Sequence, residues 1–249
     1  MTWFHIAIRE LRALLGTVMG WLVLGSFLLV FGALWCLNVF VYLTWSEELS
    51  GAPGTQQLLL SDNLITPLYS SMILIFVFVC PAISMRLFSE DYKQHTIELL
   101  LTAPISTSEI VLGKFAGAMG FITLMLLSTM YAPVFLWVWV PHDLSPFIGS
   151  YIGLWLLSAA LISMGMWFSS STSNQIAALI PSFAAGLGLY LLSFMGSDSS
   201  LFFEQLAMGN HLTEFFRGII QLSDVSYFVC FTSFFLLATH QRVQAYRWR

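Results

Sequence analysis

The histidines are the first residues to consider for chemistry, because catalysis needs a nucleophile beside a base, or several ligands around a metal. His95 and Glu98 lie one helical turn apart, a spacing that suits a metal only if further ligands converge on it. The five histidines fall in loops or at the edges of apolar segments, and the chain has no Gly-x-Ser-x-Gly nucleophile elbow. We therefore expect no metal site. An enzyme that acts within the membrane is the least favoured of the functions weighed below.

Other chemistry-bearing motifs are also missing from the sequence. It has no P-loop, so the chain itself is expected to bind no nucleotide or other cofactor. Cys36, Cys80 and Cys230 each stand alone inside an apolar run, which is typical of small buried hydrophobes rather than of a disulfide or a metal site. The basic residues form no cluster longer than a few residues, so a nucleic-acid partner is not expected.

The composition indicates an integral membrane protein. Of the 249 residues 58% are hydrophobic and only 9% are charged, against roughly 25% charged residues in soluble domains. No apolar run carries an acid, lysine or arginine away from its ends, whereas ion-coupled carriers usually need such groups. Any transport by this chain must therefore be powered from elsewhere.

The apolar runs predict an all-α polytopic protein with six transmembrane helices in a single transmembrane domain, because about 20 apolar residues cross a bilayer as a helix. The third helix is expected to start after Ser106, since Ser106 and Glu109 fit a capping box. The expected spans are residues 16–44, 64–85, 107–140, 147–168, 175–195 and 225–240.

The first 15 residues predict an amphipathic helix that lies in the membrane interface. Apolar and basic side chains follow helical spacing on two different faces: Phe4, Ile8, Leu11 and Leu15 on one, and His5, Arg9 and Arg12 on the other. The alternative is that residues 1–15 are simply the polar start of the first span.

The basic residues predict the orientation of the chain. Six spans place both termini on the same side of the membrane. If that side is the cytoplasm, eight of the nine basic residues lie inside and only Arg217 lies outside, which agrees with the positive-inside bias.

Two polar segments are expected outside the bilayer, because buried charges are costly there. Residues 86–106 form a cytoplasmic loop that is suited to contact a soluble partner. Residues 196–224 form an outer, periplasmic segment with a short surface helix or helical hairpin, in which Phe215, Arg217 and Asp224 are candidate site residues.

The central loop carries a resemblance to a known family. Phe88-Ser-Glu90, Thr96-Ile-Glu98-Leu-Leu-Leu-Thr-Ala-Pro104-Ile-Ser106 and Glu109-Ile-Val-Leu-Gly-Lys114 resemble the signature between spans two and three of type-2 ABC transporter permeases, with His95 in place of the usual glycine. Residues 215–227 resemble the branch that serves gliding motility and nitrous-oxide-reductase maturation (GldF/NosY-like), although Gln221 stands where that branch tends to have an acid.

The resemblance implies a multi-pass protein of the bacterial inner membrane that works with other chains. A separate cytoplasmic ABC ATPase dimer would hold ATP and Mg, and would dock on a short coupling helix between spans two and three. A second permease copy or a homologous permease would complete the pathway. Residues 1–15 would be the family's elbow helix. The expected coupling interface comprises Phe88, Glu90, Asp91, Tyr92, His95, Thr96, Ile97, Glu98, Leu100 and Pro104.

These residue types suit a docking surface, because aromatic and aliphatic anchors fill clefts while acidic side chains pair with cations at the rim. The alternative is an ordinary solvated loop. The sequence thus predicts a permease subunit that couples ATP hydrolysis on a partner to export or to force transmission. A different class of function is a structural or mechanical membrane anchor, with residues 196–224 holding a periplasmic or membrane-anchored accessory protein.

Overall fold

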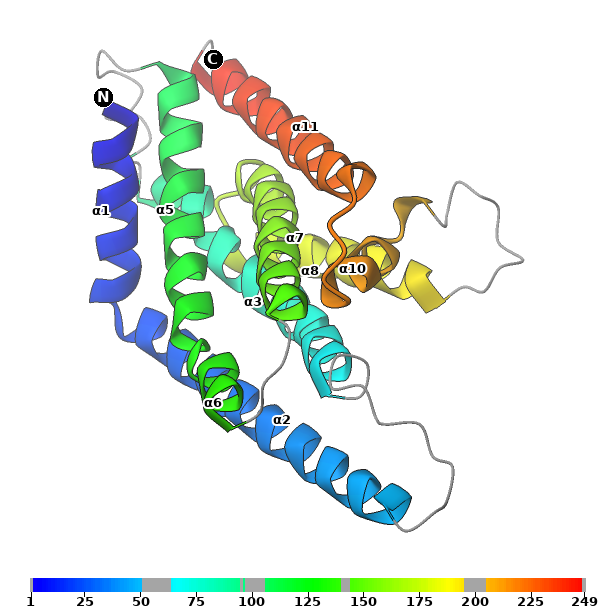
Figure 1. The fold of residues 1–249 in the computed structure, drawn as a ribbon. Helices are drawn as coiled ribbons and strands as arrows, with labels where there is room; N and C mark the ends of the chain where they lie inside the picture. The colour runs from blue at the N-terminus through cyan, green and yellow to red at the C-terminus, as the bar shows by residue number, and fades with distance from the viewer. Residues whose placement is uncertain are drawn as a thin grey trace.

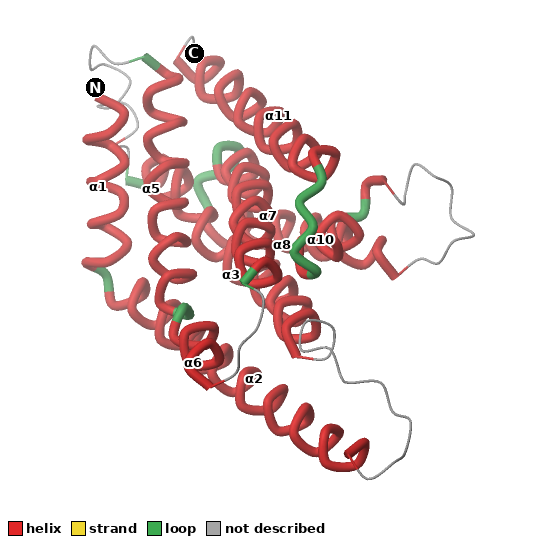
Figure 2. The backbone as a smooth tube through the Cα atoms, viewed as in Figure 1, coloured by secondary structure: helices red, strands yellow, loops and turns green. Residues whose placement is uncertain are grey.

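The computed structural model describes residues 2–50, 64–94, 96, 106–139, 144–194 and 205–247. Regular secondary structure in these residues is entirely helical (Figures 1 and 2). The elements are α1 (Thr2–Gly16), α2 (Val18–Ser50), α3 (Thr66–Lys93), α5 (Thr107–Ser128), α6 (Tyr131–Trp139), α7 (Ser145–Ser169), α8 (Gln175–Leu191), η2 (Leu192–Phe194), α10 (Met208–Phe216) and α11 (Leu222–Arg247).

Six helices within the described residues are long and apolar enough to cross a membrane, which confirms the predicted all-α, six-span architecture. Several helices extend beyond their predicted bounds, among them α2, which continues to Ser50 rather than ending at residue 44. α3 continues to Lys93, about two turns beyond the expected end at residue 85, and α11 covers residues 222–247 rather than 225–240. The reason is that a helix satisfies its own backbone hydrogen bonds and continues into water after its apolar residues stop.

The predicted separation of residues 1–15 from the first span is present as a break at Thr17, whereas the third span is interrupted where a continuous helix was predicted. α1 and α2 meet at a bend, where a Cβ on Gly20 would overlap the carbonyl oxygen of Leu14. The third span is divided into α5 and α6 at Thr129 and Met130. Pro133 explains the second break, because it has no N–H for the Thr129 carbonyl and its ring crowds that carbonyl.

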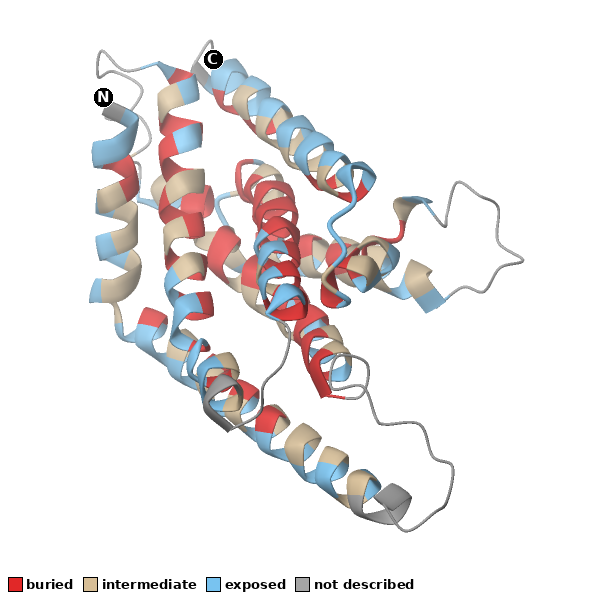
Figure 3. Cartoon of the chain, viewed as in Figure 1, coloured by how far each residue is buried: buried red, intermediate tan, exposed pale blue. Residues whose placement is uncertain are grey.

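The buried centre of the bundle is α7, which packs against α3, α5, α8, α10 and α11. Buried residues are concentrated on α3, α5 and α7, whereas α2, α8 and α11 present mostly exposed apolar side chains (Figure 3). Because exposed apolar surface is stable in lipid rather than in water, these three outer helices provide most of the lipid-facing surface of the chain.

The outer segment is more deeply integrated into the bundle than a surface helix. α10 buries four apolar side chains, Met208, Leu212, Phe215 and Phe216. It approaches α7 so closely that a Cβ on Gly149 would overlap the carbonyl oxygen of Phe215. α10 ends in a Schellman motif at Gly218, which has a φ of +82°. The prediction of a short helix is confirmed, and one face of this helix is buried in the bundle while Asn210 and Thr213 are exposed.

The close approach of α10 to α7 generates a stability prediction. Gly149→Ala should lower the free energy of unfolding by about 1–3 kcal/mol, because the added methyl group overlaps the α10 backbone. Gly188→Ala is the matched control: a Cβ there meets no heavy atom within 4 Å, and alanine favours the helix. Thermal unfolding of the detergent-solubilised chain measures both, and equal stability of the two variants would contradict the packing described here.

Candidate functional site at the junction of α1, α3 and α5

A buried lysine joins three helices at one end of the bundle. Lys114 lies two turns into α5, and only 1% of its side chain is exposed. Its Nζ is 2.9 Å from Oε1 of Glu10 on α1 and 2.7 Å from Oδ2 of Asp91 on α3. The same Nζ lies 5.4 Å from the ring centroid of Phe88. Two carboxylates and an aromatic face thus compensate one desolvated ammonium group.

Two glycines of α5 allow α1 to reach this lysine. A Cβ on Gly113 would lie 2.8 Å from the Ile6 side chain, and one on Gly117 would lie 2.7 Å from Cβ of Glu10. The contacts advance along both helices together, so α1 and α5 run side by side in the same direction (Figure 1). An interfacial position of α1 therefore requires that the first turns of α5 also lie at the membrane surface.

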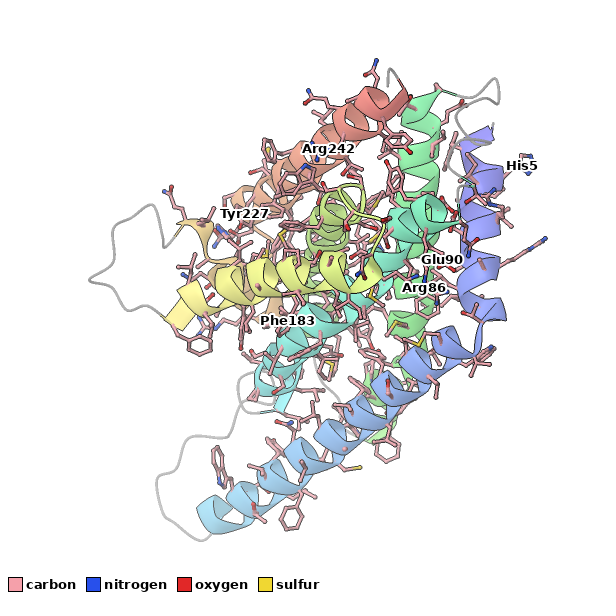
Figure 4. All side chains as sticks on the ribbon, turned by 180° about the vertical axis from the view of Figure 1, so that it is seen from behind. His5, Arg86, Glu90, Phe183, Tyr227 and Arg242 are labelled. Carbon is pink, nitrogen blue, oxygen red and sulfur yellow. The ribbon has the colours of Figure 1, made fainter. Side chains whose placement is uncertain are left out.

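A second ion pair and a polar cavity lie beside the lysine. Nε of Arg86 donates to Oε2 of Glu90 at 3.1 Å, one turn apart on α3. Figure 4 shows both residues on the part of α3 that lies beside α1. A cavity of about 360 Å³ is lined by charged side chains from all three helices, which include Arg9, Glu10, Arg86, Glu90, Asp91 and Lys114. The junction is therefore a charged cluster open to water on one side.

The junction also holds both ends of the predicted coupling loop. Just after α3, which includes residues 86–93 of the predicted loop, Oγ1 of Thr96 donates to Oδ1 of Asp91 at 3.2 Å. At the end of the loop, the backbone N–H of Glu109 donates to Oγ of Ser106 at 3.3 Å, and the N–H of Ser106 donates to Oε2 of Glu109 at 3.2 Å. The predicted capping box is confirmed. The helices that lead into and out of this loop, α3 and α5, are thus joined to each other at Lys114.

Ser169, at the end of α7, connects α3 to the centre of the bundle. Its Oγ accepts hydrogen bonds from the backbone N–H groups of Phe88 at 3.1 Å and Ser89 at 3.0 Å. The hydroxyl donates in turn to the carbonyl oxygen of Met85 at 2.8 Å. A side chain that enters a helix backbone in this way fixes the local path of the helix.

The candidate coupling residues that the structure describes lie on or just after the last turns of α3. Phe88 is fully buried below Lys114, so its predicted role as an anchor in a partner's cleft is not available in this structure. Glu90 and Asp91 are engaged by Arg86 and Lys114. The half-buried Tyr92 packs on Tyr246 of α11, with ring centroids 5.0 Å apart. Five further candidates lie outside the described residues: His95, Ile97, Glu98, Leu100 and Pro104.

Of the α1 side chains chosen from the sequence, Leu11 packs against α5 at Gly120, but the others do not form the centre of the packed face. Phe4, Arg9 and Arg12 are exposed, and Ile8 and Leu11 are half-buried. The face on α5 instead contains Ile6, Ala7 and Glu10, so the helix presents three faces rather than two. Glu10, the partner of Lys114, was missed. The sequence did contain a sign of this role. Glu10 follows Ile6 by four residues and Ala7 by three, so it lies on the same helix face as these two apolar residues.

At the other end of the bundle, Asp224 forms part of a polar network between α10 and α11. Its Oδ1 lies 2.7 Å from Nδ1 of His211, while Nε2 of that histidine lies 2.9 Å from the Gln205 carbonyl oxygen. The imidazole stacks on Tyr227 with centroids 4.2 Å apart. Arg217 makes only a 3.7 Å pair with Glu214. Of the three predicted outer residues, Phe215 is buried against α7 and is unavailable to a partner in this structure.

The charged side chains of the junction are arranged in ion pairs within α3 and between helices. No group of three His, Cys, Asp or Glu side chains suited to a metal occurs in the part of the chain that the structure describes. The acids at the junction are engaged by basic side chains. The ion pairs of Lys114 hold α1, the end of α3 and the start of α5 together.

The lysine generates a prediction about stability. Lys114→Met should lower the free energy of unfolding by about 3 kcal/mol, because Glu10 and Asp91 lose their shared counter-charge. Lys93→Met, which removes an exposed lysine at the end of α3, should change it by less than about 0.5 kcal/mol. Adding Asp91→Asn to Lys114→Met should restore part of the loss. Thermal unfolding in detergent tests the three variants, and an unchanged Lys114→Met would refute the buried ion cluster.

Ser169 generates a second prediction. Ser169→Ala should destabilise the chain by about 1–3 kcal/mol, because it leaves the Phe88 and Ser89 N–H groups without this acceptor. Hydrogen exchange at these two amides should accelerate. Ser226→Ala is the control, since the Ser226 hydroxyl donates to a carbonyl of its own helix, that of Ser223. Equal exchange at residues 88 and 89 in wild type and Ser169→Ala would show that α3 does not depend on this contact.

Comparison with known proteins assigns the chain to a family. The family described as "ABC-2 family transporter protein" matches residues 4–243, which is nearly the whole chain. A protein of Bacillus subtilis (strain 168) named "Uncharacterized protein YcbO" is 22% identical over 181 residues, which cover 71% of this chain and 72% of that protein. The matched region includes α1, the charged junction and all six apolar helices. The chain belongs to the ABC-2 transporter family and is a transmembrane permease component.

Proposed function

We propose that this chain couples ATP hydrolysis on a separate cytoplasmic ABC ATPase to export or to force transmission across the bacterial inner membrane. The observation that carries the proposal is the Lys114 junction, which ties both ends of the loop between α3 and α5 to α1. A partner that moves this loop would move three helices as one body. ATP and Mg would be held by the partner, and the permease would contribute no catalytic residue.

The distribution of charge supports a cytoplasmic position of the junction. Both described chain ends lie at the same end of the bundle as the start of α5 (Figure 1). That end carries Arg86, Lys93 and Lys114, together with the arginines of α1 and the last turns of α11. Arg217 is the one basic residue of the sequence that is expected at the opposite end. Basic residues favour the cytoplasmic side of a bacterial inner membrane.

The exposed apolar surfaces of three helices are consistent with a second permease subunit packed beside this one. α2, α8 and α11 each bury only 17% of their most apolar stretch within this chain. A second copy or a homologous permease would cover part of this surface, and lipid would cover the rest. Membership of the gliding-motility and nitrous-oxide-reductase-maturation branch stays a prediction from residues 215–227.

The mechanical anchor considered from the sequence shares the ATPase partner and differs in whether hydrolysis moves a solute. Deleting residues 196–224 does not separate the two functions, because it also removes four buried core side chains of α10. Substitution of Arg217, whose side chain is 54% exposed, leaves this core intact. An accessory protein that is released by Arg217→Glu would favour the anchor.

The ATPase is tested by tagged purification from native membranes. Glu98→Lys should reduce the recovery of a co-purifying ATPase by about tenfold or more, because like charges would then face each other at the predicted rim. Glu48→Lys makes the same charge change at the far end of α2 and should leave recovery unchanged. Absence of any ATPase from mildly solubilised, folded wild-type protein would count against the proposed function.

A further inference from the structure

A second polar cavity opens at the same end of the bundle as the charged junction. Its volume is about 440 Å³, and it lies between the end of α3, the turn from α7 to α8 and the last turns of α11. Arg242, labelled in Figure 4, comes from α11. The lining consists of Tyr92, the hydroxyl-bearing run from Ser170 to Ser173, Arg242, Ala245 and Tyr246.

The lining is rich in hydrogen-bond donors and contains no acid. Arg242 forms no ion pair or hydrogen bond with any residue that the structure describes, and neither do the hydroxyl groups of Tyr92 and Tyr246. The nearby acids of α3, Glu90 and Asp91, are engaged by other basic side chains. Ser170 and Ser171 already donate to the carbonyl oxygen of Trp167. The donors open to a ligand are therefore the Arg242 guanidinium and the hydroxyl groups of Tyr92, Tyr246 and Ser173, a set that can recognise a phosphate group.

The surroundings of the cavity place it at the level of lipid headgroups. Trp167, one turn before the serine-rich turn, and Tyr92 and Tyr246 are aromatic side chains of the kind that gathers at membrane interfaces. α11 changes from apolar to polar at His240, just before Arg242. We therefore expect the cavity to lie at the level of headgroup phosphates rather than in bulk water.

Two aromatic side chains lie on the same face of α11 as Arg242, in the membrane-spanning part of that helix. Phe235 and Phe231 precede Arg242 by 7 and 11 residues, which places them on the same face of the helix. Both rings are half-buried, with centroids 4.8 Å apart, and Phe235 also contacts Trp167 at 5.9 Å. A stripe of rings below a phosphate site matches the shape of a lipid better than that of a free phosphate ion.

We propose that this cavity binds the phosphate headgroup of an anionic phospholipid. The Arg242 guanidinium pairs with the phosphate oxygens, the hydroxyl groups of Tyr92, Tyr246 and Ser173 supply further donors, and an acyl chain lies along Phe235 and Phe231. The lipid bridges α3, the α7–α8 turn and α11 next to the coupling junction. The proposal rests on the proposed function only for the cytoplasmic orientation of this end.

Native mass spectrometry of the full chain, released from nanodiscs of phosphatidylcholine with a minority of phosphatidylglycerol, tests the site. Wild type should retain a phosphatidylglycerol molecule, and Arg242→Gln should retain about tenfold less, since a charge-assisted hydrogen bond is lost. Arg242→Lys should retain an intermediate amount, because it keeps the charge but loses the planar fork. Arg12→Gln, an exposed arginine on α1, should bind like wild type.

Three outcomes would overturn the proposal. Equal retention by wild type and Arg242→Gln, or equal loss in Arg12→Gln, would show attraction of anionic lipid by surface charge alone. Displacement of phosphatidylglycerol by added inorganic phosphate would assign the cavity to a soluble anion. Loss of the ATPase but not of lipid in Arg242→Gln would assign it to protein docking. Because the lipid measurement uses only this chain, failure to find an ATPase partner leaves it unaffected.

Discussion

The organisation of this permease depends on one desolvated ammonium group held between two carboxylates. Lys114, Glu10 and Asp91 come from three helices that are far apart in sequence, and each charge needs the others because the lysine has almost no contact with water. Removing one partner of a buried charge cluster costs several kcal/mol, whereas separating helices that are joined only by apolar contact costs less in lipid. The cluster therefore determines that α1, α3 and α5 keep a fixed relation at this end.

Smaller features serve this constraint. Gly113 and Gly117 remove the side chains that would keep α1 too far from α5 for Glu10 to reach Lys114. The capping box at Ser106 starts α5 at the residue that places Lys114 two turns inside the helix. Ser169 holds the backbone of α3 beside Phe88, the residue below the lysine. Glycine spacing, helix capping and a buried hydroxyl thus act together on one contact.

Features encoded locally were predictable, and pairings across the fold were not. Composition and run length identified the six spans, and the pattern Ser106 to Glu109 identified a helix start, because neither depends on the rest of the chain. The continuation of α3 to Lys93 was missed because hydropathy locates the membrane boundary and not the helix end. The role of Glu10 was missed because its partner lies 104 residues away. The burial of Phe88 was missed for the same kind of reason, because its ring lies against Lys114 of another helix.

Two features interrupt or contact the backbone hydrogen bonds of α3 between the centre of the bundle and the Lys114 junction. Pro81 lacks an N–H, so one intrahelical hydrogen bond is absent there, and one turn later Ser169 enters the backbone near Met85 and Phe88. Beyond these levels, α3 carries the charged pairs that bind it to α1 and α5. A helix bends most readily where a proline interrupts its hydrogen bonds. Because Ser169 holds the backbone from Met85 to Ser89 and the ion pairs hold the end beyond it, a bend in α3 is expected at Pro81, and motion of the charged end would reach the bundle centre through that point.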